Sequence, residues 1–173
     1  MIFVISGLSG DVNLEVYRRF GHGNEGCAMT KDKTHRDIQY GALPWRLGQG
    51  ARSEVMLLTS RETRRWVIPK GWPMKKTKPR DAAEIEVFEE AGVVGQMVGK
   101  RPIGTYHYAK HLVDGFTLCL VRVYLFRVER ELDEWPEMEQ RRREWFEPRE
   151  AARLVDEGGL AEIIGNFATH RFI

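Results

Sequence analysis

The sequence predicts an α/β sandwich built on a mixed β-sheet. Strand-like runs dominate the chain from residue 39 onward, one helix with a strong start and stop signal interrupts them, and one or two further helices follow. A length of 173 residues fits one domain with a few appended segments, and a hydrophobic content of 42% is enough for a core.

The strands before the central helix are expected at Gln39–Leu47 and Glu54–Ser60, with Gly48–Gly50 as the turn between them. Trp66–Ile68 reads as a short buried strand that Pro69 ends, since proline donates no backbone hydrogen bond to a ladder.

The central helix is expected at Pro79–Glu90. Proline suits a first helical turn, Ala82 and Ala83 favour a helix, and Gly92 is a typical terminator.

The second half of the chain is expected to add strands and one or two short helices. The strands are Val98–Tyr108 and Phe116–Val128, joined by a turn at Asp114-Gly115, and Glu144–Phe146; the helices are Pro148–Val155, closed by Gly158-Gly159, and Leu160–Ile164.

These elements define the expected domain organisation. Residues 1–36 include the glycine-rich stretch Gly21–Gly26, show no sustained periodicity and are interpreted as an extension outside the core fold. Residues 37–165 form the domain, and residues 166–173 are expected to be a tail. Met29 is a candidate for the native start of translation, which recovery of a peptide from residues 3–18 by mass spectrometry would exclude.

Composition argues for a cytoplasmic protein. The two cysteines, Cys27 and Cys119, lie far apart and do not form a disulfide framework, which suits a reducing compartment. No apolar run approaches the ~20 residues that cross a bilayer, and the chain does not start like a secretory signal. We therefore expect no membrane partner. The net charge of +2 identifies no partner, and a nucleic-acid partner is not expected.

Charge is distributed unevenly around the central helix. Eight basic residues and one acid lie between Arg61 and Arg80, and such a zone attracts phosphates, although a solvated surface is the alternative for each lysine. On the helix, Glu86, Glu89 and Glu90 are spaced i, i+3 and i+4, so they share one face and have no basic partner at helical spacing.

Three like charges on one face repel each other unless a cation neutralises them. Oxygen ligands suit Mg²⁺, which typically joins carboxylates to substrate phosphates. We therefore expect Glu89→Gln and Glu90→Gln to leave the melting temperature nearly unchanged or to raise it. The alternative is a solvated acidic helix face.

The spacing of these residues resembles the Nudix signature, G-x5-E-x7-R-E-U-x-E-E-x-G-U, where U is aliphatic. Gly71 and Glu86–Val93 match it, and the resemblance extends to Trp66–Gly71 and Glu144–Ala152, covering about residues 37–165. Two positions depart from the pattern, because Thr77 replaces the first glutamate and Ile85 the arginine. Thr77 is a candidate helix cap, and Ile85 is expected on the buried side.

The resemblance implies a Nudix-type α/β/α sandwich and a metal-dependent phosphoanhydride hydrolase that uses Mg²⁺ or Mn²⁺. It implies that Glu86 and Glu90 are the principal metal ligands, that Glu89 is a further ligand or the base, and that the Gly71 carbonyl can coordinate. A distant glutamate is the base in some members, so Glu134, Glu137 and Glu139 are candidates, with a solvated loop acid as the alternative for each.

Within the family the chain resembles the diphosphoinositol polyphosphate phosphohydrolase branch, which also cleaves dinucleoside polyphosphates. This implies a polyphosphorylated small-molecule substrate, and basic residues are needed to hold it. The candidate substrate-binding residues are Ser60, Arg61, Lys70, Lys75, Lys76 and Arg142, the last from the run Arg141–Arg143. Two alternatives remain open: a nucleoside triphosphate or other nucleoside diphosphate derivative as substrate, and a catalytically silent nucleotide-binding module. The sequence leaves the oligomeric state open.

Overall fold

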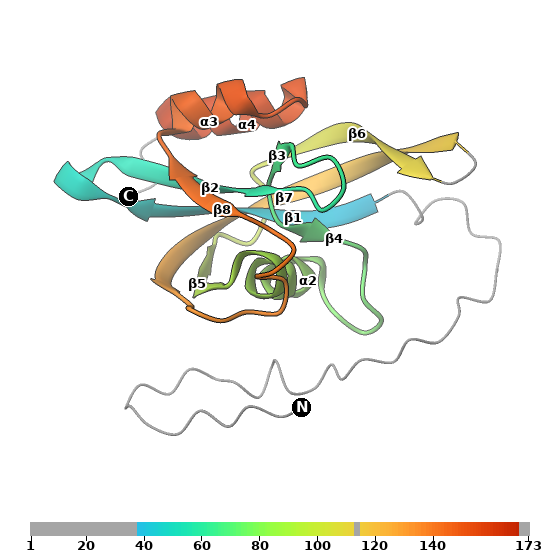
Figure 1. The fold of residues 1–173 in the computed structure, drawn as a ribbon, viewed down its shortest axis with the longest axis horizontal. Helices are drawn as coiled ribbons and strands as arrows, with labels where there is room; N and C mark the ends of the chain where they lie inside the picture. The colour runs from blue at the N-terminus through green and yellow to red at the C-terminus, as the bar shows by residue number, and fades with distance from the viewer. Residues whose placement is uncertain (1–37, 113–114, 170–173) are drawn as a thin grey trace. The chain divides into compact units, whose positions relative to one another are not determined.

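The chain folds as a layered α/β/α sandwich, which confirms the expected fold class. In the computed structural model, residues 38–112 and 115–169 are described, and they contain an eight-stranded sheet. The helix α2 (Pro79–Glu86) covers one face of the sheet, and α3 (Pro148–Leu154) with α4 (Gly158–Thr169) cover the other (Figure 1). The expected N-terminal extension and residue Asp114 of the expected turn lie outside the described residues.

The sheet is mixed, as the sequence predicts. Its main path runs β3-β2-β1-β7-β5, with β4 on β1, β6 on β7 and β8 on β2. Only the β1–β7 pair is parallel among the described pairs. The bounds are β1 Ile38–Leu47, β2 Ser53–Thr59, β3 Trp66–Val67, β4 Lys70–Gly71, β5 Val93–Val98, β6 Gly104–Leu112, β7 Gly115–Glu131 and β8 Arg143–Phe146.

One expected strand is wrong. The segment Val98–Tyr108 is divided between β5 and β6, which both pair with β7 at different points along its length. Gly99 has a φ of 75°, a left-handed conformation that suits a turn, and Pro102 lies in the same connection. The turn therefore separates two strands where the sequence analysis expected one.

The central helix changes its winding halfway along. It is α-helical from Pro79 to Glu86 and then continues as a π-helical turn, η2 (Val87–Ala91), before Gly92 ends it with a φ of 61°. A π turn is rare and widens the helix locally, and such turns are frequent at functional sites. Glu89 and Glu90 therefore lie on a π-helical turn, whereas the sequence predicts a regular α-helix over Pro79–Glu90.

Two apolar layers hold the sandwich together, one on each face of the sheet. Alternation along the strands sends Leu43, Val55 and Leu57 to one face and Ala42, Met56 and Leu58 to the other. The first group packs against α3 and α4, and the second packs against Ala82, Ala83 and Val87 of the central helix. This second layer fixes the helix against the sheet.

The last helix is longer than expected. The sequence predicts it at Leu160–Ile164, with a tail from residue 166, whereas α4 runs to Thr169. Phe167 is only 4% exposed and packs against Trp45, with ring centroids 5.7 Å apart, so residues 166–169 belong to the packed domain. None of the helices in the described ranges is long and apolar enough to cross a bilayer.

Candidate functional site

The site begins where the short strand β4 meets the central helix. Gly71 is buried and pairs with Tyr40 of β1. A Cβ atom at position 71 would collide with the carboxylate of Glu86. Glycine leaves this space open, and a side chain here would force the flexible end of Glu86 to move away from the strand backbone.

Glu86 has a strongly raised pKa within the acidic segment, which we define as Glu86, Glu89 and Glu90. Burial raises its pKa to about 8, and repulsion from Glu90, Glu89 and Glu137 adds to this rise, while Lys70 opposes it. Burial is the main cause of this shift, and the charge of Lys70 offsets it only in part. A cation placed against Glu86 would restore its ionised form.

Glu90 has different surroundings, because protein groups already engage it. Its Oε2 accepts a hydrogen bond from the backbone N–H of Lys70 at 3.1 Å, and its Oε1 accepts one from the guanidinium of Arg141. Burial raises the pKa of Glu90, but the charges of Lys70 and Arg141 act against that rise. The helix supplies no basic partner at helical spacing, as expected, but Arg141 from a distant part of the chain engages Glu90.

Arg141 comes from the loop before β8 and connects several parts of the site. It is 8% exposed, and besides Glu90 it donates from Nε to Glu137 at 2.6 Å and from Nη1 to the carbonyl oxygen of Thr59 at 3.3 Å. In the sequence, Arg141 belongs to a run of candidate phosphate-binding arginines. The structure instead buries its side chain against two carboxylates.

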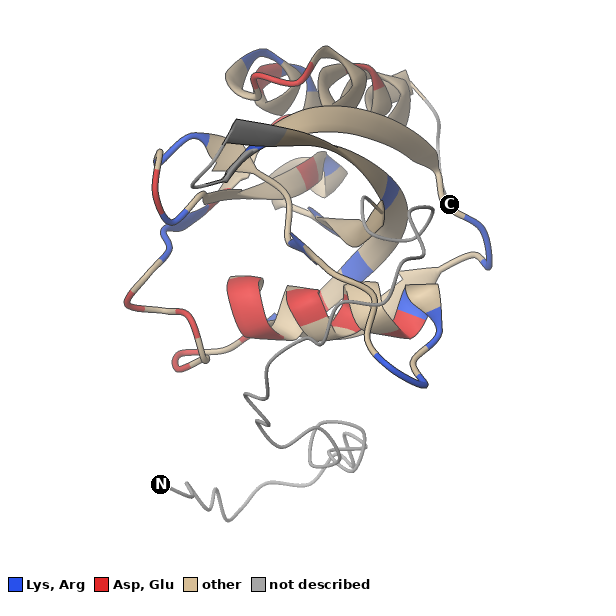
Figure 2. Cartoon of the chain, turned by 90° about the vertical axis from the view of Figure 1, so that its right-hand side faces the viewer, with Lys and Arg blue, Asp and Glu red and all other residues tan. Residues whose placement is uncertain are grey.

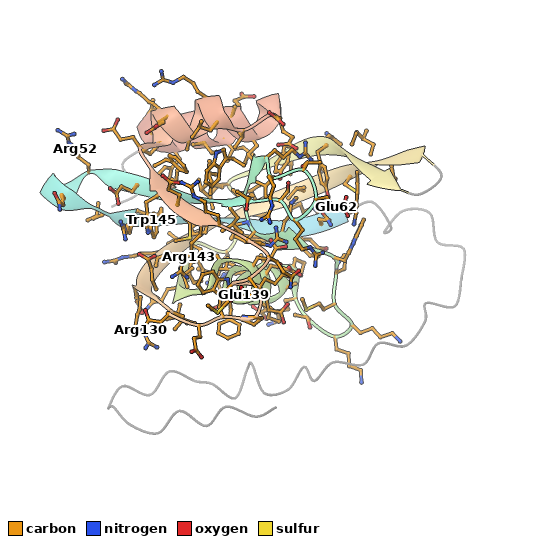
Figure 3. The ribbon with its side chains drawn as sticks, viewed as in Figure 1. Arg52, Glu62, Arg130, Glu139, Arg143 and Trp145 are labelled. Carbon is orange, nitrogen blue, oxygen red and sulfur yellow. The ribbon has the colours of Figure 1, made fainter. Side chains whose placement is uncertain are left out.

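Glu137 is the acid of the preceding loop that reaches the acidic segment. Its backbone N–H donates to the carbonyl oxygen of Glu89 at 3.2 Å, and its charge contributes to the raised pKa of Glu86. Glu134 and Glu139 are exposed, and Figure 3 shows Glu139 in the loop before β8. Of the three candidate distant acids, the structure thus brings Glu137 to the site.

The donor set has the right chemistry for a hard divalent ion, with carboxylate oxygens beside the backbone of a glycine. Among the described residues, however, no three His, Cys, Asp or Glu side chains are arranged closely enough to hold a metal ion. Figure 2 shows the acidic positions along the central helix below the sheet.

Lys70 lies between this acidic segment and the neighbouring strand β6. Burial lowers its pKa, while the nearby charge of Glu90 acts in the opposite direction. Its Nζ lies 5.3 Å from the ring centroid of Tyr108, whose hydroxyl donates to Gln39 at 2.7 Å. The backbone of Lys70 binds Glu90, so the side chain is held within the site.

The other candidate substrate-binding residues lie at the rim. Ser60 bonds to Thr63 across 2.7 Å in the loop between β2 and β3. Arg61 is exposed with its Nη1 3.5 Å from Glu137, and Arg142 is exposed and paired with Glu144. Lys75 and Lys76 are exposed in the loop that leads into α2, so they lie at the opposite end of this helix from Glu90.

The two departures from the Nudix pattern have different outcomes. Ile85 is 4% exposed, as expected for the buried side of the helix. Thr77 does not cap the helix: the cap residue is Lys78, without a side-chain cap bond, and the Thr77 hydroxyl lies 3.4 Å from the carbonyl oxygen of Lys75. The cap prediction is wrong because Pro79 is the first helical residue, which makes Lys78 the cap.

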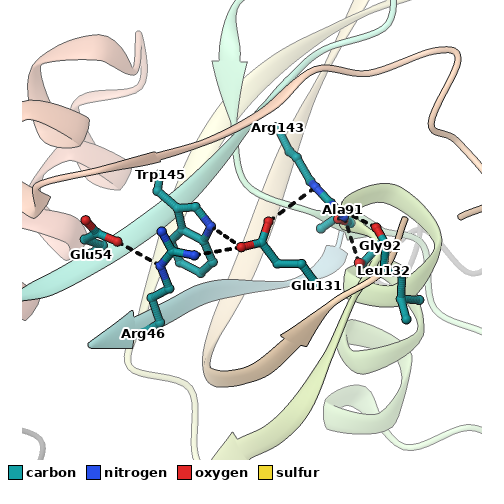
Figure 4. A network of polar contacts seen from close by, with 8 residues as sticks. All are labelled: Arg46, Glu54, Ala91, Gly92, Glu131, Leu132, Arg143 and Trp145. Carbon is teal, nitrogen blue, oxygen red and sulfur yellow. Dashed lines mark hydrogen bonds and ion pairs between the residues drawn. The ribbon is translucent and has the colours of Figure 1, made fainter. Parts of the chain in front are cut away.

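Arg143 has a structural role at the far end of the helix. Its Nη1 donates to the carbonyl oxygens of Ala91 and Gly92, both at 2.8 Å, and its Nη2 donates to Leu132 at 2.7 Å (Figure 4). These bonds satisfy carbonyls that a helix end leaves free. The same network continues through Glu131, Trp145 and Arg46 to Glu54 of β2.

Comparison with known proteins assigns the family. A family model described as the NUDIX domain matches residues 41–167, so the chain belongs to the Nudix family. This match covers the central helix, β4 and the loop that contains Arg141. The Nudix resemblance found from the sequence is therefore confirmed.

Several curated proteins are similar to this chain. Nudix hydrolase 4 of Arabidopsis thaliana is 28% identical over 116 residues, which cover 66% of this chain and 53% of that protein. Diphosphoinositol polyphosphate phosphohydrolase 3-beta of Bos taurus is 33% identical over 108 residues, covering 59% of this chain and 60% of that protein. The chain thus spans little more than half of either relative.

A solved structure shares the fold. The crystal structure of Ap4A hydrolase from C. elegans has a TM-score of 0.58 and 18% sequence identity, covering 76% of this chain and 96% of that chain. At this level of identity the likeness concerns the fold alone. Nudix hydrolases generally use divalent metal ions and act on small phosphate compounds.

Proposed function

We propose that this protein is a divalent-metal-dependent hydrolase that cleaves a phosphoanhydride bond in a polyphosphorylated small molecule. The observation that supports this most strongly is the meeting of Glu86 with Gly71. A carboxylate with a pKa near 8 faces a position where any side chain would collide with it. Such an arrangement is costly for a purely structural helix and is useful for holding a cation.

The residues that would hold the ion are Glu86 and Glu90 as principal ligands, with Glu89 as a further ligand or the base and the Gly71 carbonyl as an additional donor. Mg²⁺ is the proposed ion, with Mn²⁺ as an alternative. When bound, it would neutralise charge on the phosphates and favour attack by water. Because no three acidic side chains of the described residues lie close enough to hold an ion, the carboxylates would have to draw together around it.

Other residues of the chain would act as the base and orient the substrate. Glu137 is a second candidate for the base, since it lies within electrostatic reach of Glu86. The substrate would be oriented by Ser60, Arg61, Lys70, Lys75, Lys76 and Arg142. Arginine and lysine suit this task because they place positive charge against phosphate oxygens.

For the substrate we propose a diphosphoinositol polyphosphate or a dinucleoside polyphosphate. Relatives named diphosphoinositol polyphosphate phosphohydrolase support the first. A nucleoside triphosphate or other nucleoside diphosphate derivative is the alternative, since plant relatives that match at similar identity have names that specify no substrate. A cytoplasmic location stays a prediction, because the relatives include proteins named mitochondrial and chloroplastic.

The test is a panel of phosphoanhydride compounds, assayed for phosphate release with Mg²⁺ and with Mn²⁺. We expect at least one inositol pyrophosphate or dinucleoside polyphosphate to be cleaved, and Glu86→Gln to lower its turnover by orders of magnitude. The silent-module alternative predicts the opposite: ligand binding in a metal titration without any release of phosphate. Full Mg²⁺-dependent activity in Glu86→Gln would contradict the assigned site.

A further inference from the structure

The proposed function gives no role to Arg141, although this residue is buried in the site. Its side chain is 6% exposed, yet it carries a charge that the surrounding protein must stabilise. The guanidinium contacts the carboxylates of Glu90 and Glu137 and the carbonyl oxygen of Thr59. The planar guanidinium fixes the direction of these hydrogen bonds in addition to supplying a positive charge. An arginine needed only for solubility would not be buried in this way.

The bonds to Glu90 leave this carboxylate able to bind a metal ion. Arg141 uses Oε1 and the Lys70 backbone N–H uses Oε2, at 3.1 Å. Each carboxylate oxygen can accept more than one partner, so each keeps a site for a further contact. The two bonds therefore orient the carboxylate without exhausting it.

Glu90 also lies close to Glu86. Glu90 is bonded to the backbone of Lys70, and Glu86 touches Gly71, the next residue of β4. Consecutive Cα atoms lie about 3.8 Å apart. Two carboxylates from successive turns of the helix thus meet one two-residue strand, and Arg141 is bonded to the second of them.

The helix offers no cation of its own next to Glu90. Neither α2 nor η2 has a basic residue in its last turn, and position 85 is a buried isoleucine. The partner must therefore come from elsewhere in the chain. Arg141 is supplied by the loop before β8, and it is itself held by Glu137 and by the edge of β2 at Thr59.

We propose that Arg141 is a positioning residue for the metal site, which holds Glu90 in the orientation that binds the ion. This inference rests on the proposed function, in which Glu90 is a metal ligand. Loss of an outer partner of a metal ligand typically weakens metal affinity about 10- to 100-fold. Arg141 acts through Glu90 and does not need to touch the substrate.

The experiment is isothermal titration of the full chain with Mn²⁺, together with thermal melting in EDTA. We expect Arg141→Met to weaken Mn²⁺ binding about 10- to 100-fold. Arg141→Lys keeps the charge but loses the planar fork, so it should restore only part of the affinity. It also serves as the milder variant if Arg141→Met does not fold.

Arg143→Met is the matched control, because Arg143 braces the same helix end through backbone carbonyls. It should lower the melting temperature while changing Mn²⁺ affinity by less than about threefold, well below the loss expected for an outer partner of a ligand. If Arg141→Met binds Mn²⁺ as tightly as the wild type or more tightly, the inference is wrong and Arg141 is only a counter-charge. An equal loss of affinity in both variants would also overturn it, since general loosening of the helix would explain both.

Glu90→Gln, titrated in parallel, separates this inference from the proposed function. If Glu90→Gln binds Mn²⁺ normally, the proposed ligand set is wrong, and the inference fails with it. If Glu90→Gln loses affinity and Arg141→Met does not, the ligand set stands and only the role of Arg141 is rejected.

Discussion

Glu86 and Glu90 lie four residues apart on one helical segment, but the protein treats them differently. Glu86 faces glycine backbone and other acids, and its pKa rises to about 8. Glu90 is more deeply buried, yet it is bonded to Arg141 and to the backbone of Lys70. The comparison shows that identical residues at ideal motif spacing need not share one electrostatic state. Repulsion dominates the charges around Glu86, whereas a cation is bonded directly to Glu90.

The largest effect is expected from filling the space beside Glu86. The Cβ atom introduced by Gly71→Ala would collide with the carboxylate and displace it. We expect turnover to fall at least about 100-fold, because misplacement of a site residue by about 1 Å can have this effect. Steady-state kinetics with Mg²⁺ would measure it. Gly165→Ala, at a position with open space around it, is the control and should remain active. Unchanged activity in Gly71→Ala would show that turnover does not depend on the contact between Glu86 and the β4 backbone.

The second prediction concerns stability and should separate the two glutamates. Glu90→Gln removes one partner of a buried ion pair and should lower the free energy of unfolding by about 3 kcal/mol. Glu86→Gln removes repulsion. It should raise the free energy of unfolding at pH values above about 8, where Glu86 is ionised. Denaturant unfolding in EDTA would measure both. For Glu90 this reverses the sign expected from the sequence, because the spacing along the helix does not reveal Arg141. If both variants changed the free energy of unfolding equally, the electrostatic difference between Glu86 and Glu90 would be contradicted.

The third prediction is a pH dependence that belongs to Glu86. Its pKa is about 8 in the folded chain and about 4.5 when unfolded, so between these values the folded state holds the extra proton. Stability must therefore decrease as the pH rises from about 4.5 to about 8. Melting temperatures of the protein in EDTA across this range should show the decrease, and Glu86→Gln should lack it. An identical slope in both proteins would mean that other groups are responsible.

The smallest effect is expected at the exposed lysines of the loop before α2. Lys75→Ala with Lys76→Ala should weaken binding of longer polyphosphates by a few-fold and of shorter ones less, since exposed charges are screened by solvent. Competition assays with polyphosphates of different lengths, at low and high salt, would test this. The same loss for every chain length would indicate that these lysines do not follow the phosphate chain.

Particular residues show how far sequence reasoning reaches. The predicted strand Gln39–Leu47 is nearly correct, because β1 runs Ile38–Leu47 with a clear apolar pattern. The predicted strand Val98–Tyr108 is wrong, since the segment Gly99–Pro102 combines two turn-forming residues with Lys100 and Arg101 and separates two strands. In the site, the family spacing alone relates Gly71 to Glu86, and in the folded chain the two residues are in contact.

Other features have only a weak signal in the sequence. Arg141 lies 51 residues from Glu90, and its neighbours Arg142 and Arg143 are of the same type. The sequence therefore marks a basic run without distinguishing its members. The structure gives each a different place: Arg141 against the acidic segment, Arg142 exposed beside Glu144, and Arg143 on the helix carbonyls. Glu137 is likewise one of three equivalent acids in the sequence, and only the folded loop brings it next to Glu89.

The sequence by itself determined the family, the sandwich and the local spacing of Gly71, Glu86, Glu89 and Glu90, because helix periodicity and turn residues act over a few neighbours. The tertiary structure alone decided which of these acids has a counter-charge. That depends on a side chain delivered from a distant loop, and the energy of a buried charge is set by whatever surrounds it in space.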